Sequence, residues 1–337
     1  MNAWVVARPG PIEKDALVPA ELPIPEPGPR EVRVAVRTCG VCRTDLHLVE
    51  GDLPPKRSRV VPGHEVVGTV EAMGEGCRRF RVGDRVGIAW LRWTCGTCRF
   101  CRRGDETLCL APRFTGWDDD GGYAQHAVVD EDYAYALPAE FGDEEAAPLL
   151  CAGIIGYRAL RRAPVPPGGR LGIYGFGASA HLAAQLALAE GATVHVLTRS
   201  EAAQRLALEL GAASAGGAYD RPPEPLDAAI LFAPVGDLVP VALAALDRGG
   251  TLAVAGIYLT DIPPLDYAEH LFQERTLQSV TANTRWDGEE FLRLAARLGV
   301  RVTTHPFPFS QAPDALRTMA SDRLRGGAAV LRIGADL

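Results

Sequence analysis

One glycine-rich stretch constrains the fold of this chain more than any other feature. The apolar run at 170–174 leads directly into Gly175-Phe176-Gly177-Ala178-Ser179-Ala180, and residues 181–190 continue with the composition of an apolar helix that stops at Gly191. A second apolar run, rich in β-branched residues, follows at 192–197. A strand, a glycine turn, a helix and a second strand in this order predict a parallel βαβ unit.

The turn itself has the spacing G-x-G-x-x-A of a dinucleotide-binding fingerprint. Gly175 permits the tight turn, Gly177 lets the backbone approach a pyrophosphate, and Ala180 allows the helix to pack closely on the strand. The N–H groups at the helix start, where Ala178 and Ser179 lie, would favour the anion. The stretch therefore predicts that a dinucleotide binds here.

Further strands and helices alternate after this unit, with strands expected at 227–232, 251–256 and 277–280. A helix is expected to begin near Leu238. Another is expected at Asp287, because Asp287 and Glu290 have the spacing of a capping box, and Gly299 would end it. These elements predict an α/β fold with a doubly wound, parallel-sheet (Rossmann) domain over 153–287.

The first half of the chain has a different pattern, in which short β-branched runs are bounded by glycine and proline. Examples lie at 32–36, 66–70 and 85–89. The proline-rich stretch 23–29 cannot be helical and is expected to be an exposed connector. We expect a mostly β domain over 1–152, to which residues 288–337 return.

This first domain carries residues suited to a catalytic metal site. Cys42 as a thiolate and His64 as a neutral imidazole are common zinc ligands, and a catalytic site keeps three protein ligands with a fourth position open. Cys151 lies in an apolar setting and is a candidate for the third ligand, and Glu65 could bind directly or support the site from beside His64. Asp45 could accept the other N–H of His64. Each of these residues alone could belong to the core, but their joint occurrence predicts a metal site.

A second group of cysteines has the close spacing of a structural zinc site: Cys95, Cys98, Cys101 and Cys109 share a loop rich in Gly, Arg and Thr. The nearest alternative is an iron–sulfur cluster. The ferredoxin run closes with C-x₃-C-P, however, whereas seven residues separate Cys101 from Cys109 here. Disulfides are the other alternative, and they are less expected in a long chain without a recognisable signal peptide.

Charge and hydropathy limit the classes of partner. The net charge of −7 and the sequence pI of about 5.6 provide no basic field for nucleic acid or for an anionic membrane surface. No apolar run approaches the roughly 20 residues of a membrane-spanning helix, and the start of the chain lacks the pattern of a signal peptide. We expect a cytoplasmic protein that acts on small molecules.

The chain resembles the zinc-dependent, medium-chain alcohol dehydrogenases from end to end. The motifs that carry the resemblance are Gly40-Val41-Cys42-Arg43-Thr44-Asp45-Leu46-His47, Pro62-Gly63-His64-Glu65, the cysteines at 95–109, Cys151-Ala152-Gly153 and Gly175-Phe176-Gly177. The resemblance implies a GroES-like catalytic domain and a Rossmann domain. It implies two zinc ions per chain: a catalytic zinc on Cys42, His64 and Cys151 with Glu65 close by, and a structural zinc on the four clustered cysteines. It also places Arg43 at the cofactor pyrophosphate.

The same resemblance implies a proton relay through Thr44 and the cofactor ribose towards His47. It puts Trp90 and Leu91 in the substrate pocket, with Trp117 as a further pocket residue. Core packing is the alternative for each of the three.

Two positions depart from the family pattern. Many relatives carry a threonine where this chain has Ile155, so nicotinamide binding could differ. At the end of the second Rossmann strand, an NAD enzyme usually offers a carboxylate to the ribose, whereas this chain has Thr198-Arg199-Ser200. A guanidinium and two hydroxyls suit a 2′-phosphate, and Glu201 is better explained as a first-turn helix residue. We therefore expect NADP(H) in preference to NAD(H).

The expected activity is hydride transfer between the nicotinamide cofactor and a primary or secondary alcohol, or the reverse reduction of an aldehyde or ketone. A polyol or amino-alcohol dehydrogenase of the same superfamily is one alternative, although it would need a more polar pocket than Trp90 and Leu91 provide. A non-catalytic zinc- and cofactor-binding relative is another, although it would not need the relay residues. A homo-oligomer is expected, with a tetramer preferred over a dimer.

Overall fold

The computed structural model describes residues 1–321, 324 and 327–334. The chain forms two compact units: Met1–Cys151, Ala282–Ala296 and Val302–Leu337 make the first, and Ala152–Thr281 and Arg297–Arg301 make the second. The sequence predicts a return to the first domain at residue 288, whereas the contacts of the first unit resume at Ala282. The earlier return has a local cause, since Asn283 is buried and its side-chain amide donates to the Tyr135 hydroxyl at 3.4 Å.

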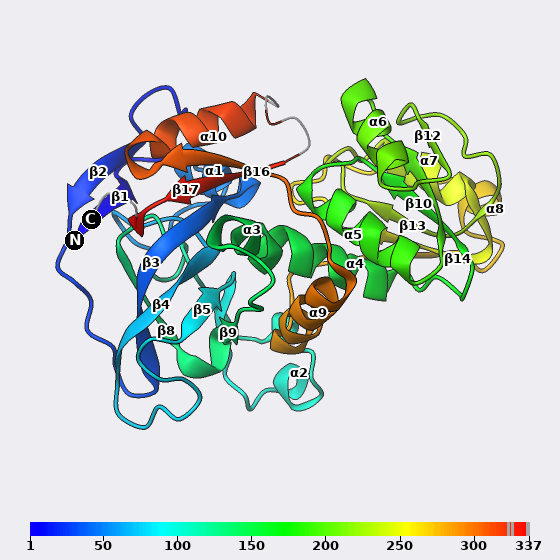
Figure 1. Ribbon diagram of the computed structural model, residues 1–337. Coiled ribbons are helices and arrows are strands. Elements are labelled where there is room, and N and C mark those ends of the chain that lie inside the picture. The colour runs from blue at the N-terminus through cyan, green and yellow to red at the C-terminus, as the bar shows by residue number, and fades with distance from the viewer. Residues whose placement is uncertain (322–323, 325–326, 335–337) are drawn as a thin grey trace. The chain divides into compact units, whose positions relative to one another are not determined.

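A seven-stranded sheet forms the centre of the first unit (Figure 1). Valines alternate along its longest strand, so Val32, Val34 and Val36 are buried, and each contributes about 1.5–3 kcal/mol when fully removed from water. The strands run in the order β16 (Thr304–Pro308), β17 (Ala328–Arg332), β3 (Glu31–Val41), β4 (Val66–Met73), β5 (Arg85–Ile88) and β9 (Ala134–Ala136), with β8 (His126–Asp130) also paired to β3.

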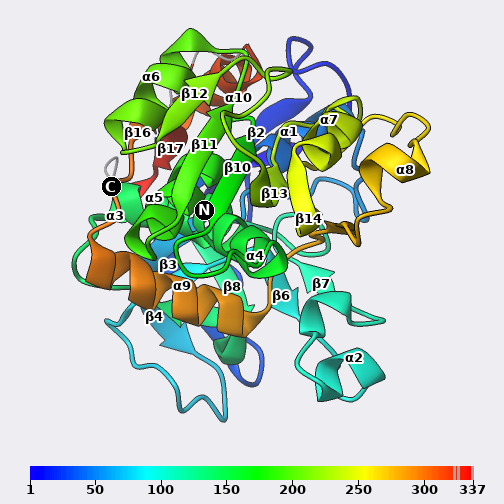
Figure 2. The same cartoon turned by 90° about the vertical axis from the view of Figure 1, so that its right-hand side faces the viewer.

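Two small antiparallel sheets and several helices complete this unit. One sheet pairs β1 (Asn2–Val6) with β2 (Leu17–Glu21), and the other pairs β6 (Leu91–Trp93) with β7 (Arg113–Phe114). In Figure 2, β6 and β7 lie between β8 of the main sheet and α2. The helices are α1 (Arg43–Glu50), α2 (Arg99–Arg102), α3 (Asp143–Pro148), α10 (Ala312–Ala320) and the larger part of α9 (Arg285–Leu298).

The second unit contains a six-stranded parallel sheet, whose middle strands are seen side by side in Figure 2. The strand order is β12 (Ser214–Gly216), β11 (Thr193–Leu197), β10 (Arg170–Tyr174), β13 (Leu226–Leu231), β14 (Leu246–Val254) and β15 (Thr276–Ser279). The order reverses direction next to β10, the strand that leads into the glycine turn. This reversal is the point at which ligands bind in doubly wound sheets.

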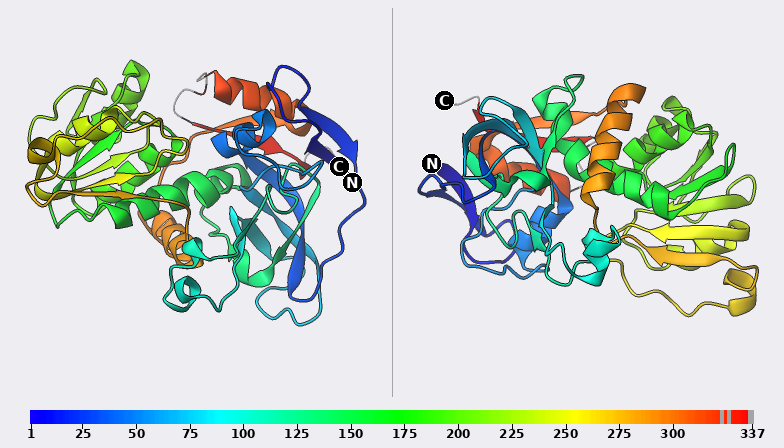
Figure 3. Two further views of the ribbon diagram at one scale, coloured as in Figure 1. Left: turned by 180° about the vertical axis from the view of Figure 1, so that it is seen from behind. Right: turned by 90° about the horizontal axis from the view of Figure 1, so that it is seen from below.

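Helices cover both faces of the parallel sheet, as Figure 3 shows. Alanines of α4 (Ile154–Arg162), α5 (Ala178–Ala189) and α6 (Glu201–Glu209) pack on one face, and leucines of α7 (Leu238–Ala244) pack on the other. A short α8 (Tyr267–His270) precedes β15. None of the helices in the described part of the chain is both long and apolar enough to cross a bilayer.

Two elements begin more than one residue away from their predicted start. The strand expected at 251–256 begins five residues earlier, at Leu246, as β14. The helix expected to start at Asp287 begins at Arg285, because Thr284 is the capping residue. The Thr284 N–H donates to Asp287 Oδ2 at 2.7 Å, and the Asp287 N–H donates to Thr284 Oγ1 at 3.1 Å. Glu290 instead pairs with Arg293 on the same helix.

Candidate catalytic and metal centres

Cys42 lies at the junction between β3 and α1, which fixes the direction of its side chain. Its backbone N–H donates to Asp45 Oδ2 at 2.9 Å, which completes the cap of α1. Its Sγ lies 3.7 Å from Thr44 Oγ1. The first turn of α1 therefore places a thiol, a hydroxyl and a carboxylate within a few residues of one another.

Asp45 links this turn to the segment that carries His64. The carboxylate is only 2% exposed and accepts the Gly63 N–H at 3.0 Å and the Tyr123 hydroxyl at 3.4 Å. Its Oδ1 lies 3.3 Å from His64 Nδ1. The sequence predicts contact of Asp45 with His64. The structure adds that one carboxylate orients the backbone beside both Cys42 and His64.

Cys151 joins this group from a distant part of the sequence. It lies in a π-helical turn, Leu149–Gly153, and its Sγ is 3.8 Å from Cys42 Sγ. One donor atom from each of Cys42, His64, Glu65 and Cys151 lies within 4.8 Å of all the others. Zinc–sulfur bonds of about 2.3 Å at a tetrahedral angle place two sulfurs about 3.8 Å apart, so the donor set fits Zn²⁺.

The electrostatics of this buried group favour a cation. The hydrogen bond from Cys151, followed by the nearby His64, holds the pKa of Cys42 well below its usual range. Burial would lower the pKa of His64, but Asp45 and Cys42 raise it well above its usual range. Burial, followed by the Cys42 thiolate, raises the pKa of Glu65. A dication among these donors would stabilise their deprotonated forms.

The second cysteine group lies in the loop between β6 and β7. Cys98 Sγ and Cys101 Sγ are 3.5 Å apart, as are Cys109 Sγ and Cys95 Sγ, and Cys95 Sγ is 4.0 Å from Cys101 Sγ. These separations also fit a tetrahedral Cys₄ zinc site. Backbone N–H groups of Thr97 and Cys98 donate to Cys95 and lower its pKa to about 6, which favours the thiolate that binds metal.

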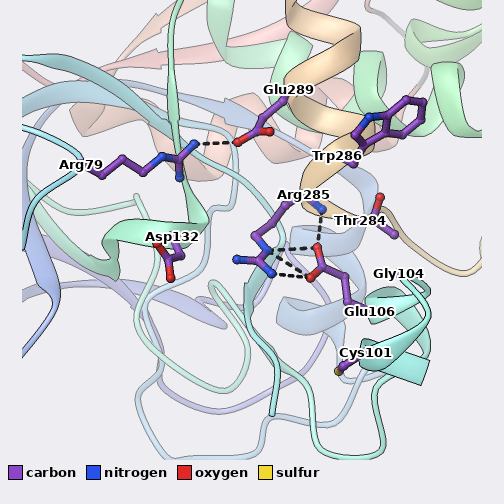
Figure 4. Close-up of a pocket in the computed structure, with 9 residues that line it drawn as sticks. All are labelled: Arg79, Cys101, Gly104, Glu106, Asp132, Thr284, Arg285, Trp286 and Glu289. Atoms are coloured by element: carbon purple, nitrogen blue, oxygen red, sulfur yellow. Dashed lines mark hydrogen bonds and ion pairs between the residues drawn. The ribbon is translucent and has the colours of Figure 1, made fainter. Parts of the chain in front are cut away.

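An ion pair anchors this cysteine loop to the start of α9 (Figure 4). Glu106, which is largely buried, accepts the Arg285 backbone N–H at 2.6 Å and its guanidinium at 2.8–3.1 Å. The Arg285 guanidinium also lies 4.6 Å from the ring centre of Tyr133. A cavity of about 450 Å³ beside this pair is lined by Trp286 and by charged side chains, including Arg79, which binds Glu289 at 2.7 Å.

The predicted dinucleotide turn connects β10 to α5. Gly175 has φ of +83°, and a Cβ there would approach the backbone nitrogen of Ala233 to 2.9 Å, so only glycine fits. A Cβ on Gly177 would meet nothing within 4 Å, which leaves open space in front of the helix start for a ligand. Ala180 is fully buried against the sheet. The turn fits the pyrophosphate of a dinucleotide.

Comparisons with known proteins agree with this geometry. Residues 28–139 match the alcohol dehydrogenase GroES-like domain, and residues 180–297 match the zinc-binding dehydrogenase domain. A probable alcohol dehydrogenase of Mycobacterium tuberculosis is 59% identical over 98% of this chain and 97% of its own length. The chain belongs to the zinc-dependent, medium-chain alcohol dehydrogenase family.

Solved structures of this family have the same fold. A cinnamyl alcohol dehydrogenase of Sorghum bicolor superposes with a TM-score of 0.88 at 27% identity, covering 99% of this chain and 98% of that one. A cobalt- and zinc-bound thermostable alcohol dehydrogenase of Pyrobaculum aerophilum has a TM-score of 0.89 at 27% identity, covering 98% and 99%. The expected pairing of a GroES-like domain with a Rossmann domain is thus confirmed.

The relay residues Thr44 and His47, predicted from the alcohol dehydrogenase family, lie on α1, as does Arg43, the residue predicted to bind the cofactor pyrophosphate. Arg43 and Thr44 are in the first turn of α1 and His47 is in its last turn. His47 Nδ1 lies 3.0 Å from Asp52 Oδ2, so a carboxylate orients its ring.

The predicted substrate residues differ in their surroundings. The Trp90 ring lies 5.0 Å from the His64 ring in an edge-to-face arrangement, and Trp117 stacks 6.0 Å from Trp90. Leu91 is fully buried in the core of the first unit, in agreement with its alternative interpretation. Phe114 completes the aromatic group at 4.9 Å from Trp90. Sequence reasoning missed Phe114, because no local pattern distinguishes it from a core residue.

The residues expected at the adenosine end of the cofactor lie where β11 meets α6. Thr198 is buried, and Arg199 is exposed. Ser200 is the N-cap of α6 and accepts the Ala203 N–H at 3.4 Å, a role that the sequence interpretation did not assign. Glu201 is the first residue of that helix, as predicted. Ile155 lies in the first turn of α4.

Proposed function

We propose that this chain is a zinc-dependent alcohol dehydrogenase or aldehyde reductase that prefers NADP(H). The observation that carries the proposal is the convergence of Cys42, His64, Glu65 and Cys151 donor atoms within 4.8 Å, on a chain that also has the dinucleotide turn at Gly175. The substrate would be a primary or secondary alcohol, or the matching aldehyde or ketone. The names of its relatives support this class of substrate.

Cys42, His64 and Cys151 would hold the catalytic zinc. Glu65 would either support the site from beside the zinc or bind directly at the fourth, open coordination position. The four cysteines of the 95–109 loop would hold a second, structural zinc. Bound Zn²⁺ would act as a Lewis acid on the oxygen of the alcohol or carbonyl, while the nicotinamide exchanges hydride with its carbon.

The remaining residues would orient ligands and move the proton. Asp45 holds the backbone beside Cys42 and His64 and so fixes the spacing of two ligands. The Thr44 hydroxyl, 3.7 Å from the Cys42 sulfur, would donate or accept a proton at the substrate oxygen. His47, with Asp52 against its Nδ1, would pass that proton to solvent.

The preference for NADP(H) rests on Arg199, an exposed guanidinium at the end of β11. A charged hydrogen bond to a 2′-phosphate contributes about 1.5–3 kcal/mol, so Arg199→Ala should raise KM for NADPH roughly 10- to 100-fold and change KM for NADH little. Arg205→Ala is the matched control, because Arg205 lies on α6 and pairs with Glu201 at 3.7 Å. Equal changes for both cofactors with Arg199→Ala would contradict the preference.

We also propose a homo-oligomer, with a tetramer preferred over a dimer. Strand β15 is an outer strand of the parallel sheet, and the segment before it exposes Ile257, Ile262, Tyr267 and Phe272. Light scattering on the purified protein should give the mass of an assembly, and Phe272→Asp should lower that mass. A monomeric wild type would refute this part. The cytoplasmic location stays a prediction.

Metal analysis and a cofactor-oxidation assay test the central proposal together. We expect two zinc ions per chain, and oxidation of NADPH faster than of NADH with benzaldehyde, cinnamaldehyde or hexanal. Two zinc ions without turnover on any aldehyde or matching alcohol would favour the polyol or non-catalytic alternatives. One zinc ion or none would contradict the assignment of a site.

A further inference from the structure

Three aromatic rings lead outward from the predicted metal ligand His64. The His64 ring is buried, and its neighbour Trp90 is half-buried. Trp90 and Phe114 stack with an angle of 19° between their planes, and Trp90 and Trp117 with an angle of 11°. Phe114 and Trp117 also stack, at 5.8 Å with an angle of 28°, so the three rings form one stacked aromatic group beside the metal donor set.

A single lysine holds the outer ring of this group. Lys56 Nζ lies 3.7 Å from the ring centre of Trp117, within the range of a cation–π interaction, and 2.8 Å from Asp118 Oδ1. The Lys56 side chain is 41% exposed, so it is accessible to solvent even though it is paired. Of the 35 basic residues in the chain only two are lysines, Lys14 and Lys56.

Other contacts hold the loop that carries Trp117 and one edge of its ring, and Lys56 covers the face of the ring. The indole N–H of Trp117 donates to the Pro54 carbonyl at 2.9 Å. Asp118 also accepts the Phe114 N–H at 2.9 Å, and Asp120 accepts the Val61 N–H at 3.0 Å. These bonds join the loop to the segment that precedes His64. The N–H bond and the stacking on Trp90 and Phe114 restrain the ring, and the ammonium over its face adds a restraint on its tilt.

We propose that Lys56 is a positioning residue for substrate selectivity, which holds Trp117 parallel to Trp90 and so favours aryl and conjugated carbonyl substrates over saturated ones of similar size. The proposal rests on the proposed dehydrogenase function, because it concerns the substrate of that site. A planar substrate ring gains from stacking on an aromatic ring of this group, whereas a puckered ring gains only from burial. The expected gain from stacking is roughly 2- to 10-fold in kcat/KM.

The test compares benzaldehyde with cyclohexanecarbaldehyde, a flat and a puckered six-membered ring on the same aldehyde. Lys56→Met keeps the length of the side chain and removes the charge, and Lys56→Arg keeps a cation that can lie over an indole. We expect Lys56→Met to lower the kcat/KM ratio of the two aldehydes roughly 2- to 10-fold through a higher KM for benzaldehyde, with kcat little changed. Lys56→Arg should restore most of the ratio. The two aldehydes differ in intrinsic reactivity, but this difference is the same for every variant. It therefore cancels when the kcat/KM ratio of one variant is compared with that of another.

Lys14→Met is the matched control, since Lys14 is the other lysine and is exposed. It should leave the ratio at the wild-type value. An unchanged ratio in Lys56→Met, or an equal fall in Lys56→Met and Lys56→Arg, would overturn the proposal, because the charge on the indole would then not decide selectivity.

A second readout needs no turnover. Stacked indoles give a near-ultraviolet circular dichroism signal that depends on their mutual orientation, so Lys56→Met should reduce the aromatic signal and Lys14→Met should not. If wild type reduces neither aldehyde with either cofactor, the proposed function fails and the selectivity claim is overturned with it. An unchanged spectrum in Lys56→Met would separately overturn the positioning of Trp117.

Discussion

The carboxylate of Asp45 offers the sharpest test of how this chain builds its predicted catalytic centre. It accepts the backbone N–H of Cys42 at 2.9 Å and that of Gly63 at 3.0 Å, and lies 3.3 Å from His64 Nδ1. Asp45→Asn preserves the size of the side chain but leaves one carbonyl oxygen for these two N–H groups. The other N–H must then face an NH₂ group, which is also a donor.

The size of the effect follows from these contacts. Loss of one charged hydrogen bond weakens the local structure by about 1.5–3 kcal/mol, and a buried N–H left without an acceptor adds about 1–3 kcal/mol. The affected groups are the backbone of one predicted ligand and the ring of another, so part of this loss should appear in metal binding. Substitution of a residue that orients metal ligands typically weakens metal binding about 10- to 100-fold.

Competition with a chromogenic chelator measures this affinity, and the metal proposed for the Cys95 loop would provide an internal reference. We expect Asp45→Asn to release one metal at a lower chelator concentration than wild type and to retain the other. Asp84→Asn is the control, because Asp84 also accepts a backbone N–H, from Arg81 at 2.8 Å, but is exposed. Wild-type affinity at both sites of Asp45→Asn would refute the reasoning. Equal loss from both sites would show that Asp45 supports the fold of the whole unit and not this site.

Two further substitutions test packing and charge. A Cβ on Gly40 would lie 1.8 Å from Glu65 Oε2, so Gly40→Ala should displace that carboxylate. We expect the substitution to lower the free energy of unfolding in urea by about 1–3 kcal/mol. Gly10→Ala is the control and should be close to neutral, because a Cβ on Gly10 would meet nothing within 4 Å. The hydrogen bonds from Arg170 lower the pKa of Asp227 in the folded protein. They therefore stabilise the fold at any pH above the pKa of an unfolded aspartate, which is about 3.9. This stability is lost as the pH falls through the lowered pKa of the folded protein. Asp227→Asn should therefore cost about 1–2 kcal/mol at pH 7, and the difference from wild type should shrink below about pH 4; a difference independent of pH would contradict the assignment.

Most secondary structure could be predicted from the sequence, because its signals are local. The alternating valines of β3 and the glycine turn at Gly175 are set by backbone stereochemistry and by which face is buried. The errors fell at boundaries. The cap of α9 is Thr284, and both Thr284 and Asp287 have residue types that begin helices, so only the hydrogen bonds distinguish them.

The cysteine loop and the pair Cys42 and His64 could also be found by spacing, because their residue types are restricted by metal chemistry. The contacts of the neighbouring aromatic and apolar residues could not be found in this way. Leu91 and Trp90 are neighbours in sequence, yet one is fully buried in the core and the other faces the His64 ring. A strand sends successive side chains to opposite sides, and the sequence does not say which side holds the site.

The sequence by itself thus determined the family, the order of the two domains and the types of residue available for metal and cofactor. Only the tertiary structure decided which other residues meet. Lys56 lies over Trp117 and Glu106 binds Arg285, although each pair is far apart in sequence. Such long-range contacts depend on the register of the sheet and on the paths of the loops between elements. These are set by the packing of the whole unit, so no short stretch of sequence encodes them.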